Sequence, residues 1–117
     1  MNKIYYLATC STCIRIIKEL GINESNFDMQ DIKSNSITEN QIDEMKNLGG
    51  SYESLFSRRA MKYKSMGLAE KTLSENDYKE LILSEYTFLK RPVFIIKGKI
   101  FIGNSSKIVD EVKQILD

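Results

Sequence analysis

The feature that most restricts the fold is a strand–helix–strand pattern at the start of the chain. Residues 3–7 (KIYYL) are β-branched and aromatic, which is typical of a buried strand. Apolar residues then recur at helical spacing from Ile14 to Leu20, ahead of Gly21, which favours a helix end. Residues 26–32 (NFDMQDI) alternate as a second strand would. Two strands joined by a helix within about thirty residues form a crossover, which makes the strands parallel.

The middle of the chain predicts helices. A capping-box pattern at Thr38 and Gln41 begins the first, which Gly49 and Gly50 end, and Ser74 begins another. The expected apolar faces are Ile42, Met45 and Leu48 in the first, and Tyr78, Leu81 and Ile82 in the other. Residues 54–68 between them predict a loop leading into a short helix.

The last part of the chain predicts a hairpin and a closing helix. Strands are expected at residues 93–96 and 100–102, joined by a turn at 97–99. The closing helix has apolar positions at Ile108, Val109, Val112, Ile115 and Leu116. The order βαβ, helical insert at about residues 37–88, then ββα predicts an α/β, thioredoxin-like fold with a four-stranded mixed sheet. A chain of 117 residues suits one such domain, residues 1–117.

Composition excludes several classes of function. The chain has no histidine, which removes Ser-His-Asp and Cys-His catalysis, and two cysteines alone are too few for a zinc site, so we expect no metal. The 17 Lys and Arg residues nearly balance 16 Asp and Glu, so a general basic surface for nucleic acid is absent. No run of about 20 apolar residues could span a membrane, and the first residues do not resemble a signal peptide. We therefore expect a cytoplasmic protein that binds no nucleic acid directly.

The two cysteines form one CxxC motif, Cys10–Ser11–Thr12–Cys13, where the first strand ends and the first helix begins. Free amides at a helix start stabilise an anion, so Cys10 is expected to ionise readily, helped by the hydroxyls of Ser11 and Thr12. Cys13, one turn later, could resolve a mixed disulfide formed at Cys10. The alternative is a pair of inert, packed cysteines.

Four arginines could add positive charge near the thiol: Arg15, Arg58, Arg59 and Arg91. Arg91 precedes Pro92, the only proline, at the start of a predicted strand. A cis proline there would turn a backbone edge toward the substrate, and Arg91 could bind negative charge. Trans proline and solvated surface arginines are the commoner outcomes, so both alternatives stay open.

Taken together, four segments resemble the ArsC/Spx family, which comprises glutaredoxin-coupled arsenate reductases, Spx transcription regulators and their relatives. They are CSTC after the first strand, LFSRRAMKY in the insert, FLKRPVF before the hairpin and IFIG at its end. The resemblance covers essentially the whole chain. It implies a catalytic Cys10, oxyanion or partner-thiol contacts from Arg91 and Arg59, which is assigned by its spacing to Tyr63, and a cis peptide bond at Pro92.

The chain departs from the family pattern in three places. Ile14 stands where relatives often have a basic residue directly after the CxxC motif, and Arg15 comes one position later, about 100° around the helix. The well-studied arsenate reductases lack a cysteine at the place of Cys13 and carry another arginine after the last hairpin, where this chain has residues 103–105 (GNS). An oxyanion site with three arginines is therefore incomplete, which disfavours arsenate but leaves thiol–disulfide chemistry intact.

Three hypotheses follow. The first is a reductase in which Cys10 attacks an oxyanion or disulfide, Cys13 or an external thiol resolves the product, and glutathione with glutaredoxin, or thioredoxin, supplies electrons without any bound cofactor. The second is an Spx-like regulator that binds the RNA polymerase α subunit and uses the cysteines as a redox switch. The third is an inert relative with a structural role.

Overall fold

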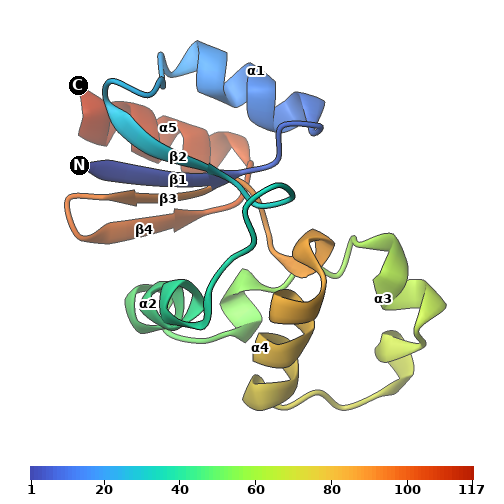
Figure 1. Ribbon diagram of the computed structural model, residues 1–117. Coiled ribbons are helices and arrows are strands. Elements are labelled where there is room, and N and C mark those ends of the chain that lie inside the picture. The colour runs from blue at the N-terminus through green and yellow to red at the C-terminus, as the bar shows by residue number, and fades with distance from the viewer. The chain divides into compact units, whose positions relative to one another are not determined.

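The computed structural model describes residues 1–117, which divide into two compact units. We call Met1–Ser36 together with Arg91–Asp117 the core unit, and Ile37–Lys90 the insert unit. The insert unit covers the residues, about 37–88, for which the sequence predicts a helical insert. Figure 1 shows the strands and helices of each unit.

The core unit contains the sheet. Its elements are β1 (Asn2–Tyr6), α1 (Ser11–Glu19), β2 (Phe27–Asp31), β3 (Val93–Ile96), β4 (Lys99–Ile102) and α5 (Ser106–Leu116). The strand order is β2-β1-β3-β4, with β1 and β2 parallel and the other two pairings antiparallel. The predicted four-stranded mixed sheet and the parallel crossover are therefore confirmed.

Two helices cover one face of this sheet (Figure 1). Ile16 and Ile17 of α1 and Val109 and Val112 of α5 join strand residues in a single buried cluster. The buried face of α1 also includes Cys13, whereas Ile14 and Leu20, two of the positions expected to be apolar contacts, are only half-buried. The burial of α1 therefore fixes one sulfur of the CxxC motif inside the core.

The hairpin turn is one residue shorter than predicted. Lys97 and Gly98 form the turn alone, with φ angles of 53° and 77°, and Lys99 already pairs with Ile96. Positive φ at both central residues is what a two-residue type I′ turn requires, and it matches the twist of the strands. The sequence prediction placed Lys99 in the turn because it is a charged residue next to a glycine. Residue type of this kind locates the end of a strand only weakly.

The insert unit is helical. It contains α2 (Glu39–Gly49), α3 (Met61–Ser65) and α4 (Glu75–Ser84), with short 3₁₀ turns at Glu53–Leu55, Leu68–Glu70 and Tyr86–Phe88. Both expected helix starts are present as complete capping boxes, Thr38 with Gln41 and Ser74 with Asp77. None of the helices in the structure is both long enough and apolar enough to cross a membrane.

Aromatic rings hold the insert unit together. The Phe56 ring lies 4.9 Å from that of Tyr78 and 5.1 Å from that of Phe88, between ring centroids, and its side chain is fully buried. Leu48, expected on the apolar face of α2, is instead 40% exposed. The prediction for Leu48 was wrong: α2 buries only Ile42 and Met45.

We predict that Phe56→Ala lowers the free energy of unfolding by about 3–5 kcal/mol, because it removes a fully buried ring from between two others. Leu48→Ala, in the same unit, should lower it by about 0.5 kcal/mol or less because Leu48 is exposed. Urea unfolding followed by circular dichroism measures both variants. Equal losses would contradict this account of the insert core.

Candidate redox site

Cys10 is the last residue before α1. Its backbone is extended (φ −92°, ψ 112°), and its carbonyl accepts the first helical hydrogen bond, from the Ile14 N–H at 3.1 Å. Its own N–H donates to the Leu7 carbonyl at 3.0 Å, which closes the loop after β1. Cys10 therefore occupies the N-cap position, as the sequence predicts.

The surroundings of Cys10 favour its thiolate. The thiol is half-buried, and burial, the strongest single influence, opposes ionisation. The amides of Cys13 and Thr12, the thiol of Cys13 and the positive charge of Arg91 act in the other direction and together lower the pKa of Cys10 below its ordinary value. Sγ does not complete an N-cap hydrogen bond, so this stabilisation comes from amides that lie near the sulfur without capping it.

Cys13 has the opposite character. Its side chain is fully buried in the core unit, and burial raises the pKa of Cys13 to about 11. The Leu7 backbone and Arg91 act to lower it, while the Cys10 sulfur raises it through its charge and by accepting the Cys13 S–H. The two thiols are free in this structure, and of the two only Cys10 has a lowered pKa.

Arg91 is the arginine that the core unit brings to the cysteines. It is half-buried, and its charge lowers the pKa of both Cys10 and Cys13. The Arg91–Pro92 peptide bond is cis, and the Pro92 carbonyl accepts the Gly103 N–H at 2.9 Å. The resemblance thus gave the correct isomer where the general frequency of cis bonds would have favoured trans.

The hydroxyls of Ser11 and Thr12, which the sequence predicted to help Cys10 ionise, are not among the groups that lower its pKa. Ser11 is exposed in the first turn of α1, and Thr12 lowers the pKa of Cys10 through its amide rather than its hydroxyl. The Leu7 amide, which acts on Cys13, was missed because a backbone group carries no signal in residue type.

The two insert arginines differ clearly. The Arg58 guanidinium bonds to a Glu53 carboxylate oxygen at 2.8 Å and to the Tyr78 hydroxyl at 2.9 Å, so it stabilises the insert itself. The exposed Arg59 forms no ion pair within the chain, and only its backbone N–H is engaged, with Ser57 Oγ at 3.3 Å. Of the two, Arg59 is the one whose charge is available to a ligand, and its part in the site remains a prediction.

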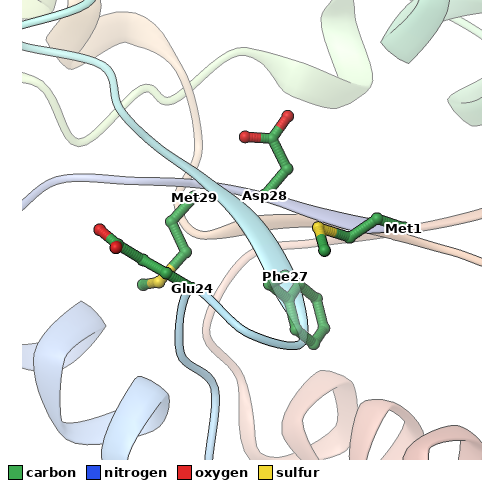
Figure 2. Close-up of a pocket in the computed structure, with 5 residues that line it drawn as sticks. All are labelled: Met1, Glu24, Phe27, Asp28 and Met29. Carbon is green, nitrogen blue, oxygen red and sulfur yellow. The ribbon is translucent and has the colours of Figure 1, made fainter.

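A pocket of about 470 Å³ lies at the other end of the sheet (Figure 2). It is lined by Met1, Glu24, Phe27, Asp28 and Met29. These residues lie where β1 and β2 begin, whereas Cys10 follows the end of β1. The pocket is therefore separate from the cysteines. The structure brings together no group of three Cys, Asp or Glu side chains that could hold a metal ion.

The sequence profile of the ArsC family matches residues 5–112. This chain belongs to the ArsC family. The match includes the CxxC motif, the whole insert, Arg91 and most of the closing helix.

Known proteins similar to this ArsC-family chain include both regulators and reductases. It is 27% identical over 108 residues to the global transcriptional regulator Spx 2 of Bacillus anthracis, covering 88% of this chain and 79% of that protein. It is 26% identical to a structure described as a possible arsenate reductase from Streptococcus mutans, with a TM-score of 0.67. The match covers 94% of this chain and 98% of that one. An arsenate reductase from Vibrio cholerae, 17% identical over 97% of this chain and 96% of that one, has the same fold with a TM-score of 0.72.

We predict that Arg91→Ala raises the pKa of Cys10, because it removes a positive charge that favours the thiolate. The thiolate fraction at pH 7 should fall, and iodoacetamide should modify Cys10 roughly two- to fivefold more slowly than in the parent protein. Mass spectrometry of the Cys10 peptide separates this reaction from that of Cys13. The rates should converge at a pH where both proteins are fully ionised.

Arg15→Ala is the matched control, since Arg15 is an exposed arginine in α1 and is not among the main causes of the lowered pKa of Cys10. Its rate at pH 7 should equal that of the parent. The same slowing in both variants would mean that general charge, rather than the position of Arg91, controls the thiol.

Proposed function

We propose that this protein is a thiol-dependent reductase of the ArsC type that acts on an oxyanion or a disulfide. The observation that carries the proposal is the contrast between the two sulfurs. The pKa of Cys10 is lowered at the start of α1, and the pKa of Cys13, one turn later in the core, is raised to about 11. This contrast supports Cys10 as the nucleophile and Cys13 as the resolving thiol.

The first step uses Cys10. With a disulfide substrate, the Cys10 thiolate attacks one sulfur, forms a mixed disulfide and releases the other sulfur as a thiolate. With an oxyanion such as arsenate, the same thiolate attacks the central atom, and one oxygen leaves as water after protonation. Arg91 balances the negative charge of the Cys10 thiolate, which passes to the leaving sulfur of a disulfide or adds to the charge that an oxyanion brings.

The second step uses Cys13. The Cys10 thiolate is one of the causes that hold the pKa of Cys13 high, and this charge disappears when Cys10 becomes part of a mixed disulfide. Cys13 then loses its proton more easily and attacks the Cys10 sulfur. The Cys10–Cys13 disulfide forms and the substrate leaves reduced by two electrons, so the protein has been oxidised by the same amount.

A recycling thiol must return both cysteines to the reduced state. We propose glutathione with glutaredoxin, or thioredoxin, as the donor, since the cycle needs two electrons and no bound cofactor. Arg59 is proposed as a second substrate contact because its guanidinium has no ion pair in the insert, unlike Arg58. Residues 103–105 (GNS) supply no third arginine, which favours disulfides over arsenate as substrates.

We predict that the purified protein reduces a glutathionylated peptide in the presence of glutathione and glutaredoxin, or of thioredoxin with its reductase, and that it reduces arsenate more slowly. Consumption of NADPH in the coupled assay measures both. Cys10→Ser should lower turnover at least about 1000-fold, because no other nucleophile replaces the thiolate. No turnover of any member of this panel would contradict the proposal.

We further predict that Cys13→Ser accumulates a stable mixed disulfide with the glutathionylated peptide, because Cys10 can still attack but the internal resolving thiol is gone. Intact-mass spectrometry without reductant detects the added mass. Equal and mild effects of Cys10→Ser and Cys13→Ser would overturn the assignment of their roles.

A second candidate function is a redox-sensitive regulator like Spx, in which the Cys10–Cys13 disulfide is a signal. One structural observation favours it: α3 buries none of its residues, and Met61 is 89% exposed among the exposed cations Arg59, Lys62 and Lys64. Methionine and arginine are enriched at protein interfaces, so this surface suits a protein partner. Binding to purified RNA polymerase α subunit that depends on the redox state, together with no turnover, would favour the regulator.

A further inference from the structure

Asp31 lies at the same end of the sheet as Cys10. It is the last residue of β2 and stands opposite Tyr6, the last residue of β1. The two strands are parallel, so the loops that follow them emerge at one edge. The first of these loops, residues 7–10, ends at Cys10.

The Asp31 side chain connects the two loops. Its Oδ1 accepts the Ala8 N–H at 3.4 Å and the Lys33 N–H at 3.2 Å. The Ile32 N–H donates to the Tyr6 carbonyl at 2.9 Å beside these contacts. One carboxylate oxygen thus joins the loop that carries Cys10 to the turn after β2.

A second observation places the carboxylate near the end of β1. Burial raises the pKa of Tyr6, and the negative charge of Asp31, followed by that of Glu24, raises it further. This charge effect agrees with the pairing of Asp31 with Tyr6 at the end of β1, where the cysteine loop begins.

We propose that Asp31 is a positioning residue that fixes the loop of residues 7–10 and so holds Cys10 at the start of α1. Ala8 and Thr9 are exposed, and within this loop the Cys10 N–H to Leu7 carbonyl bond is the internal constraint. Without the contact from Asp31 to Ala8, the loop samples other conformations, and the Cys10 sulfur spends less time near the amides of Thr12 and Cys13. This inference deepens the proposed function and depends on it only for its consequence in turnover.

Loss of the Asp31 hydrogen bond and loss of the Asp31 charge are expected to shift the pKa of Cys10 in opposite directions. The negative charge of Asp31 disfavours a nearby thiolate, so removing the charge alone would make Cys10 more acidic or leave it unchanged. Loss of the acceptor oxygen loosens the loop and makes Cys10 less acidic. Asp31→Asn keeps an acceptor oxygen without the charge, whereas Asp31→Ala removes both.

The experiment is a titration of the Cys10 thiolate by its absorbance at 240 nm, with alkylation of the Cys10 peptide at pH 7 as a second measurement. We expect Asp31→Ala to raise the pKa of Cys10 and to slow alkylation about threefold or more. Asp31→Asn should match the parent or react slightly faster. Asp28→Ala is the matched control from the same strand, since the exposed Asp28 pairs with Lys3 at 2.9 Å near the start of β1, and it should leave the titration unchanged.

Several outcomes would overturn the inference. Parent-like titration of Asp31→Ala, equal effects of Asp31→Ala and Asp31→Asn, or the same effect from Asp28→Ala would each exclude a positioning role. Circular dichroism checks that each variant is folded, and if Asp31→Ala fails to fold, Asp31→Val, which also lacks charge and acceptor, is compared with Asp31→Asn instead. A high pKa of Cys10 in the parent protein would instead contradict the proposed function. The titration of the parent measures this separately from the effect of the Asp31 variants.

Discussion

The candidate site depends on one balance, between the burial of the Cys10 sulfur and the dipoles and charge that surround it. Burial alone would keep the thiol protonated, as it does at Cys13. At the first position of the motif, burial is partial, and the amides of the first turn, the Cys13 thiol and Arg91 outweigh it. The sheet, the crossover helix and the strand after Arg91 matter to function because they bring these groups to one sulfur.

The contrast between the two sulfurs follows from helix geometry. Cys10 is the N-cap and faces the loop, whereas Cys13 lies one turn later on the face that also buries Ile16 and Ile17. A spacing of three residues therefore puts one sulfur at the edge of the core and the other inside it, while keeping them neighbours. No histidine or metal is needed to distinguish the two thiols.

The sequence predicted what depends on local patterns. Periodicity and capping residues gave the order of elements, the helix starts at Thr38 and Ser74, and Cys10 at the beginning of α1. It failed where tertiary packing decides, as at Leu48, which has the right spacing in α2 but is exposed. Asp31 was seen only as part of a strand pattern, because its contact with Ala8 joins residues 23 positions apart. A residue type cannot show which backbone amide its side chain will meet.

The burial of Cys13 also bears on whether the family's reductase or regulator role applies here. A donor thiol that reduces the proposed Cys10–Cys13 disulfide must attack the more accessible Cys10 sulfur and expel Cys13 as a thiolate. Thiols of high pKa leave slowly, and burial, rather than the charge of Cys10, is the largest cause of the raised pKa of Cys13. The oxidised form is therefore expected to be longer-lived than one with an exposed resolving cysteine. A reductase needs a recycling thiol that reduces the disulfide quickly despite the slow departure of Cys13. In a regulator, slow reduction of the disulfide would set how long the signal lasts. The rate at which the disulfide is reduced, more than the rate at which it forms, separates the two functions.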